Sequence, residues 1–146
     1  MFYRIISTLF FIGYFPFAPG TVASAFAIVI LFLFRPSNTI LFLILILGFI
    51  LGVISSDKMV KKTNTKDPSC IVIDEFAGCL TAVILIPLTP QNLLIAFIFF
   101  RFFDIIKPPP IKQIEKRVHG GLAIMIDDII AGIMSNLLLR ILLMLL

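Results

Sequence analysis

The amino-acid sequence predicts an all-α fold, a polytopic membrane bundle of about four to five hydrophobic helices. Hydrophobic residues make up 60% of the 146 residues and charged residues only 14%, and the mean hydropathy is +1.16. A water-soluble chain of this length would expose more surface than so few polar residues can cover. The length also suits one domain, so residues 1–146 are expected to form a single unit.

Five apolar segments are expected to form the helices of this bundle. They cover residues 19–34, 38–56, 71–87, 91–103 and 124–146. The second contains an unbroken apolar run over residues 40–54, which with its small-residue flanks approaches the roughly 20 residues that cross a bilayer. The third and fourth are short for full spans, so they either tilt little or form a hairpin that does not cross completely.

Two further boundaries follow from local sequence. Pro87 and Pro90 separate the third segment from the fourth, because proline lacks the N–H that a helix needs and disfavours helix in the residue before it. Residues 1–12 are apolar apart from Arg4 and are not followed by a small-residue cleavage pattern. They are therefore expected to form a retained N-terminal helix.

Basic residues indicate which ends of the helices face the cytoplasm. They concentrate in the loop before the third segment and in the loop before the fifth, whereas the other two loops offer only Arg35. By the positive-inside rule both basic loops are cytoplasmic, which places the N-terminus inside and the C-terminus outside. The same side chains suit anionic lipid headgroups, and without a recognisable motif no nucleic-acid partner is expected. The residues are Lys58, Lys61, Lys62 and Lys66 in one loop and Lys107, Lys112, Lys116 and Arg117 in the other.

Acidic residues lie at the predicted cytoplasmic ends of three different helices. Asp74 and Glu75 open the third segment, Asp104 closes the fourth, and Asp127 and Asp128 lie in the opening turns of the fifth. Carboxylates at a membrane boundary are costly unless they are solvated, paired or coordinated. The helix dipole accounts for acids at an N-terminus but disfavours Asp104 at a C-terminus. We therefore expect the five carboxylates to share one site at the cytoplasmic rim.

This set of oxygen ligands predicts a Mg²⁺ site, because Mg²⁺ binds through a few carboxylates together with phosphate oxygens. Adjacent acids on a helix point about 100° apart, so one of each pair is expected to face the site. Groups that can bind a phosphate surround the acids, as cationic side chains or as glycine-rich backbone at a helix start. These candidates are Arg101, Lys107, Arg117, Gly20, Thr21, Gly120 and Gly121.

Four blocks of sequence carry a resemblance to a known family. They are residues 13–21 (GYFPFAPGT) with Ser24, residues 67–78 (DPSCIVIDEFAG), residues 100–108 (FRFFDIIKP) with Pro110, and residues 120–132 (GGLAIMIDDIIAG). In order and spacing these blocks resemble the phosphatidylglycerophosphatase A family over nearly the whole chain. The match departs at Ala23 and Ala123, where the family is expected to carry glycine; these changes affect local packing rather than chemistry.

The resemblance implies a Mg²⁺-dependent phosphatase that hydrolyses phosphatidylglycerophosphate to phosphatidylglycerol and phosphate. It implies a multi-pass protein of the bacterial inner (cytoplasmic) membrane whose active site faces the cytoplasm. On this view Asp74, Glu75, Asp104, Asp127 and Asp128 are metal ligands or water-orienting groups, with Asp67 as a secondary candidate. Arg101 and Lys107 are the expected phosphate clamps.

Covalent mechanisms fit the sequence poorly. There is no Cys-x5-Arg loop and no Asp-x-Asp motif, and His119 is the only histidine. Metal-assisted attack by water remains, with cations offsetting charge on the transferring phosphoryl group. The alternative is a small ion-transport or channel subunit, since intramembrane acids also mark ion pathways. That alternative expects acids throughout the membrane depth rather than at one face. The number of metal ions, the oligomeric state and activity on other lipid phosphomonoesters stay open.

Overall fold

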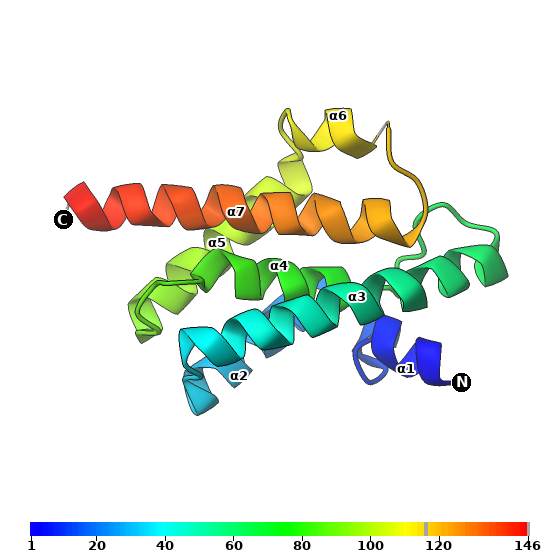
Figure 1. The fold of residues 1–146 in the computed structure, drawn as a ribbon, viewed down its shortest axis with the longest axis horizontal. Helices are drawn as coiled ribbons and strands as arrows, with labels where there is room; N and C mark the ends of the chain where they lie inside the picture. The colour runs from blue at the N-terminus through cyan, green and yellow to red at the C-terminus, as the bar shows by residue number, and fades with distance from the viewer. Residues whose placement is uncertain (116, 146) are drawn as a thin grey trace.

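The computed structural model describes residues 1–115 and 117–145, apart from the side chain of Glu115. Within these residues the fold is all-α and contains no β-strand, which confirms the all-α part of the predicted fold class. Lys116 of the predicted basic loop and Leu146 at the end of the fifth segment lie outside the described residues. In chain order the elements are α1 Phe2–Ser7, the 3₁₀ helix η1 Ile12–Tyr14, α2 Pro19–Phe34, α3 Asn38–Thr63, α4 Ile73–Val83, α5 Pro90–Ile106, α6 Ile111–Glu115 and α7 Gly121–Leu145 (Figure 1).

The observed boundaries follow from local chemistry. Ser37 caps α3 by accepting a hydrogen bond from the Ile40 N–H, and Thr89 caps α5 by accepting one from the Asn92 N–H. Side-chain oxygens at this position satisfy N–H groups that the first helical turn leaves unpaired. Lys107 ends α5 in the left-handed conformation, with a φ of 45°, and Pro108 follows it.

The structure shifts several predicted boundaries, and the two largest shifts are at the ends of α1 and α3. The N-terminal helix ends at Ser7 instead of reaching residue 12, because Leu9, Phe10 and Phe11 adopt positive φ angles that no α-helix tolerates. In contrast, α3 continues past residue 56 to Thr63. That extension is rich in lysine, which is a good helix former.

In the described part of the chain two helices, α3 and α7, are long and apolar enough to cross a membrane, with 26 and 25 residues. This is fewer than the four to five hydrophobic helices of the predicted membrane bundle. The helix α2 is apolar but has only 16 residues, and α4 has 11. Much of the apolar surface of α3 is not covered by the rest of the chain: Leu43, Ile46, Leu47 and Ile50 are each at least half exposed.

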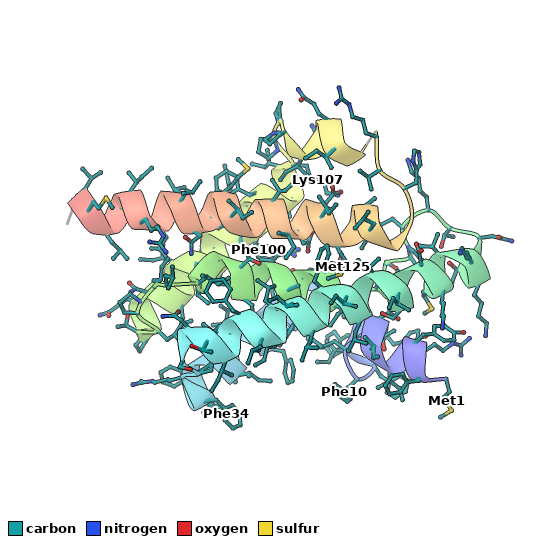
Figure 2. The ribbon with its side chains drawn as sticks, in the orientation of Figure 1. Met1, Phe10, Phe34, Phe100, Lys107 and Met125 are labelled. Carbon is teal, nitrogen blue, oxygen red and sulfur yellow. The ribbon has the colours of Figure 1, made fainter. Side chains whose placement is uncertain are left out.

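The central element of the bundle is α4, which packs against α2, α3, α5 and α7. It runs beside α7 and in the same direction (Figure 1). The two backbones approach closely where Gly132 meets the Gly78 carbonyl, and a Cβ on either glycine would collide with its surroundings. The ring of Phe100 on α5 (labelled in Figure 2) is fully buried and packs against Gly78.

The contact between Gly78 and Gly132 sets the register of the acidic residues. Asp74 lies four residues before Gly78, and Asp128 lies four residues before Gly132. Residues four apart lie on the same face of a helix, one turn away. Because α4 and α7 run in the same direction, a contact between these glycines places Asp74 opposite Asp128.

Candidate metal and phosphate site

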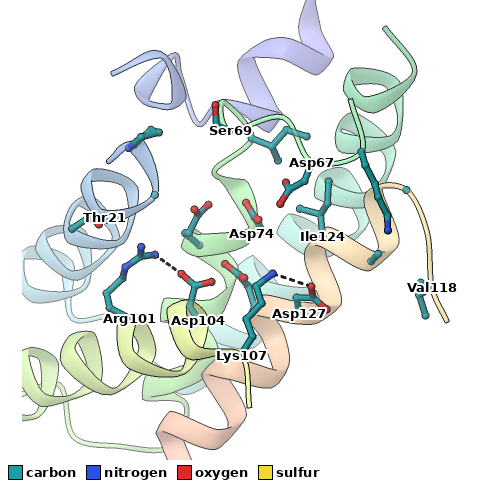
Figure 3. Close-up of a pocket in the computed structure, with 18 of the residues that line it drawn as sticks. Thr21, Asp67, Ser69, Asp74, Arg101, Asp104, Lys107, Val118, Ile124 and Asp127 are labelled. Carbon is teal, nitrogen blue, oxygen red and sulfur yellow. Dashed lines mark hydrogen bonds and ion pairs between the residues drawn. The ribbon is translucent and has the colours of Figure 1, made fainter. Parts of the chain in front are cut away.

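A pocket of about 360 Å³ opens where α2, α4 and α7 begin and α5 ends. Its volume lies within the range of roughly 300–1,000 Å³ that is typical of small-molecule sites. Figure 3 shows side chains from these four helices, and from the loop that precedes α4, converging on it. The five acids predicted from the sequence all line this pocket: Asp74, Glu75, Asp104, Asp127 and Asp128.

Three of these carboxylates form a compact cluster. One oxygen each from Asp74, Glu75 and Asp128 lies within 4.8 Å of the others. Asp74 is only 8% exposed and Asp128 only 4%. Each of the three also has a buried carboxylate oxygen (Oδ1 of Asp74, Oε2 of Glu75, Oδ2 of Asp128) with no hydrogen-bond partner among the described residues.

Such a cluster is costly unless something neutralises it. Burying a carboxylate without a partner is strongly unfavourable, and like charges at this distance repel one another. A hard divalent cation would remove both penalties, because Mg²⁺ prefers carboxylate oxygens and needs few of them. The donor set and its partnerless oxygens therefore fit Mg²⁺, with Asp74, Glu75 and Asp128 as the residues that would hold it.

The other two predicted acids hold cations at the edge of the pocket. Asp104 forms an ion pair with Arg101 one turn earlier on α5. Asp127 Oδ2 lies 3.3 Å from Lys107 Nζ. Figure 3 marks both pairs with dashed lines and shows Asp74 between them. The structure thus divides the predicted set of five carboxylates into a cluster of three and two that fix the cationic side chains.

The N-terminus of α2 completes one side of the pocket. Gly20 and Thr21 line it, and a Cβ on Gly20 would overlap the Oε1 atom of Glu75. The first turn of a helix has N–H groups without backbone partners and carries a partial positive charge. The residues predicted to cradle a phosphate therefore lie directly beside the acidic cluster.

Three predicted phosphate-binding residues have different placements. Gly120 lines the pocket, whereas Gly121 and Arg117 are not part of its lining. Gly121 is buried against the backbone of α3, and its N–H donates a hydrogen bond to Asp57 Oδ1. Arg117 is exposed.

Several residues at the site were not singled out from the sequence. The exposed Lys66 and Ser69, in the loop before α4, line the pocket. Asp67, the secondary candidate, lies in the same loop and also lines it. Asp57 fixes the start of α7 from a position 64 residues earlier in the chain. Its only signal in the sequence is an acid within a basic stretch, and no local spacing links it to Gly121.

Comparison with known proteins identifies the family. The family model described as phosphatidylglycerophosphatase A matches residues 5–143. Phosphatidylglycerophosphatase A of Escherichia coli K12 is 35% identical over 136 residues, which span 91% of this chain and 78% of that protein. Phosphatidylglycerophosphatase A of Haemophilus influenzae Rd is 42% identical over 88 residues, which span 60% of this chain and 54% of that protein.

A further relative carries a different name. It is a Bacteroides thetaiotaomicron protein, provisionally named a phosphatidylinositol-3-phosphatase, that is 31% identical over 146 residues, or 94% of this chain and 91% of that protein. No solved structure matches the chain significantly. The family match extends over all four helices that build the pocket, and the chain therefore belongs to the phosphatidylglycerophosphatase A family.

Proposed function

We propose that this chain hydrolyses the terminal phosphomonoester of phosphatidylglycerophosphate, giving phosphatidylglycerol and inorganic phosphate, with the assistance of Mg²⁺. Its family makes the chain a phosphatidylglycerophosphatase, a hydrolase that acts on a lipid. One observation carries the mechanistic part of the proposal. Three clustered carboxylates, Asp74, Glu75 and Asp128, each have a buried oxygen without a partner among the described residues, and they share one pocket with the cationic side chains of Arg101 and Lys107.

The cationic side chains and the start of α2 would bind the phosphate. Arg101 and Lys107 offset charge on the transferring phosphoryl group, and their ion pairs with Asp104 and Asp127 fix where each cation lies. The N–H groups of the first turn of α2, at Gly20 and Thr21, provide further donors for phosphate oxygens.

Asp74, Glu75 and Asp128 would hold the metal ion. When bound there, Mg²⁺ supplies Lewis-acid polarisation of a phosphoryl oxygen and lowers the pKa of a coordinated water. In the overall reaction a water oxygen forms a bond to phosphorus, and the bond between phosphorus and the glycerol oxygen breaks. The glycerol oxygen takes up a proton, which gives phosphatidylglycerol.

We also propose that the chain is a multi-pass protein of the bacterial inner membrane with its pocket on the cytoplasmic side. The uncovered apolar surfaces of α3 and α7 support membrane insertion, since large exposed apolar patches are rare on soluble monomers. The basic loops at the pocket end support its cytoplasmic orientation. A lipid headgroup in that leaflet would lie level with the pocket.

The arrangement of the acids favours an enzyme over an ion-transport subunit. A transport path is expected to place ionisable groups along the membrane depth. Here, six of the seven acids with described side chains line one pocket, and the seventh, Asp57, binds the start of α7 next to it. We do not retain that alternative.

Phosphate release from purified protein in detergent tests the proposal. We expect release from phosphatidylglycerophosphate in Mg²⁺ and none in chelator. Asp74→Asn should lower the rate by about 10³-fold, because a catalytic cation contributes several kcal/mol. Asp57→Asn is the matched control, since this acid lies outside the pocket lining and asparagine can still accept the Gly121 hydrogen bond. We expect that control to retain activity.

Two results would contradict different parts of the proposal. Release that persists in chelator, or in Asp74→Asn, would exclude the metal mechanism. Faster hydrolysis of phosphatidylinositol 3-phosphate, the lipid suggested by the name of the Bacteroides relative, would overturn the substrate assignment and leave the metal mechanism intact.

A further inference from the structure

Residues 1–17, which we term the N-terminal segment, carry an unusual exposed aromatic surface. Phe10 is 74% exposed and Phe17 77%, and Phe10 points away from the bundle (Figure 2). The α-helix of this segment has only 6 residues, so it does not cross a membrane. The aromatic side chains that are at least half exposed between the end of α1 and the start of α2 are Phe10, Phe11, Tyr14, Phe15 and Phe17.

A strained turn projects these rings outward. Leu9, Phe10 and Phe11 have φ angles of 45°, 54° and 71°, a region that non-glycine residues rarely adopt. Thr8 holds the turn, since its Oγ1 donates to the Arg4 carbonyl at 2.7 Å and accepts from the Phe11 N–H at 3.1 Å. Leu9 is buried, whereas the next two residues face outward. Strained backbone persists only where the surrounding contacts require it.

The same segment is joined to the backbone that leads into the acidic cluster. The Val72 N–H donates to the Ser7 carbonyl at 2.9 Å, and Val72 lies two residues before Asp74. Gly13 is buried and lies against the Cys70 carbonyl, so closely that a Cβ would not fit. On its other side the segment continues directly into the start of α2. A surface that binds the N-terminal segment therefore also sets the position of the pocket.

The neighbouring surface of α3 indicates the environment of the N-terminal segment. Met1, Phe2, Tyr3 and Ile6 pack beside Leu51 and Ile54, the last exposed apolar residues of α3 before its basic end. A side-chain hydrogen bond from Lys62 lowers the pKa of the half-buried Tyr3. The segment thus lies at the level where α3 changes from exposed apolar to exposed basic side chains, which are Lys58, Lys61 and Lys62.

This level matches the interface of a bilayer. Tyrosine and tryptophan concentrate at the depth of lipid headgroups, phenylalanine side chains of interfacial segments insert just beneath it, and nearby lysines attract anionic lipids. Contact with a second copy fits less well, because a two-fold contact through this surface would bring the lysines of both copies together. We propose that the N-terminal segment lies in the bilayer interface, on the side where the pocket opens, and fixes the pocket at headgroup depth.

The segment consequently selects for substrate held in a membrane, a consequence that rests on the proposed phosphatase function. A lipid in that leaflet would present its phosphate to a pocket already held at the same depth. A soluble phosphomonoester would gain nothing from this placement. The aromatic side chains therefore favour bilayer-borne substrate without contacting the reacting phosphate.

Tryptophan fluorescence can measure the depth directly, because the chain contains no tryptophan. We would place single reporters by Phe10→Trp and Phe17→Trp in vesicles of phosphatidylethanolamine and phosphatidylglycerol, with acyl chains brominated near the headgroup or near their ends. Leu47→Trp, on an exposed position of α3, serves as the deep control, and Thr65→Trp, in an exposed loop, serves as the aqueous control.

We expect bromines near the headgroup to quench the reporters at Phe10 and Phe17 more strongly than bromines near the chain ends. The deep control should show the reverse order, and the aqueous control little quenching by either lipid. Reporters at Phe10 and Phe17 that neither lipid quenches would overturn the proposal. If quenching appeared only at a protein-to-lipid ratio that gives one protein molecule per vesicle, a second copy of the protein would instead cover this surface.

Activity provides the second test. The double variant Phe10→Ser with Phe17→Ser should lose at least tenfold in kcat/KM on long-chain phosphatidylglycerophosphate in vesicles. On a short-chain, monomeric form of the lipid it should stay within about twofold of the parent. Phe34→Ser is the matched control, an exposed phenylalanine at the opposite end of α2 (Figure 2) that should not change this ratio.

If the double variant lost kcat/KM equally on both substrates, or on neither, the proposed preference for substrate held in a bilayer would be contradicted. If the parent protein hydrolyses neither lipid, the proposed function fails, and the quenching experiment still decides where the segment lies.

Discussion

The two ends of α4 both bury polar groups against α7, but only one end provides them with partners. At the C-terminal end, Asn136 Nδ2 donates to the carbonyls of Ala82 at 3.0 Å and Ile84 at 2.9 Å. Arg140 donates from Nε to Asn136 Oδ1 at 2.7 Å and from an Nη atom to the Ile84 carbonyl at 3.0 Å. At the N-terminal end, Asp74, Glu75 and Asp128 each have a buried carboxylate oxygen without a partner among the described residues.

This difference in hydrogen bonding assigns the two ends of α4 to different roles, one to the stability of the fold and the other to the candidate site. Because α4 ends after 11 residues, its last carbonyls lie inside the bundle and not in water, and α7 supplies the donors that they need. The end with paired groups stabilises the fold. The acidic end costs stability, and such a cost is expected where a site is organised for a ligand.

The largest expected effect is on activity at the acidic end. Asp128→Asn keeps the size of the side chain but removes one of the three clustered charges. We expect phosphate release in Mg²⁺ to fall by more than about 10³-fold. Thermal stability in chelator should stay the same or rise, because a buried unpaired charge has been removed.

A thiol-reactive dye can follow this unfolding. Cys79 is fully buried and becomes reactive only when the chain opens, whereas the half-buried Cys70 should be replaced by Cys70→Ser in all samples. A clear loss of stability in Asp128→Asn would show that the carboxylate stabilises the fold, and would remove the contrast between the two ends.

The second effect is on stability at the opposite end. Asn136→Leu removes the side-chain donor of the Ala82 carbonyl and one of the two donors of the Ile84 carbonyl, and it leaves Arg140 Nε without its acceptor. We expect the free energy of unfolding to fall by about 3 kcal/mol, since each buried unsatisfied group costs roughly 1–3 kcal/mol. Activity per folded molecule should change little.

Ser135→Ala is the matched control for this variant. The Ser135 hydroxyl bonds only to the carbonyl of Ala131 in its own helix, and the substitution should cost less than about 1 kcal/mol. If Asn136→Leu abolished activity at unchanged stability, the C-terminal end of α4 would contribute to catalysis and not only to folding.

The contrast between the two ends also shows how much the sequence could predict. The five apolar segments correspond to α2, α3, α4, α5 and α7, because apolar runs bounded by proline or charge are strong local signals. The acids were expected at one site because each occurs at a predicted helix end. Both predictions needed only short stretches of sequence.

The division of the five acids could not be predicted, because it depends on how helices pack. Asp128 joins Asp74 through the close contact of Gly78 and Gly132, while its neighbour Asp127 turns toward Lys107. Likewise, the carbonyls to which Asn136 donates are more than 50 residues away in the chain. The turn at Leu9 to Phe11 was missed because contacts with the loop before α4 override the helical pattern of residues 1–12.

The smallest expected effect is the stabilisation of the folded chain by bound Mg²⁺. If Asp74, Glu75 and Asp128 bind Mg²⁺, the cation stabilises the folded chain by mass action, by about 2.7 kcal/mol at a concentration 100 times its Kd. The thermal unfolding midpoint should therefore rise as Mg²⁺ is added, without any substrate present. Asn136→Leu should show the same rise from a lower starting point, since it leaves the acidic end unchanged. Asp128→Asn should show little rise, and an equal rise in that variant would mean that Mg²⁺ acts elsewhere on the chain.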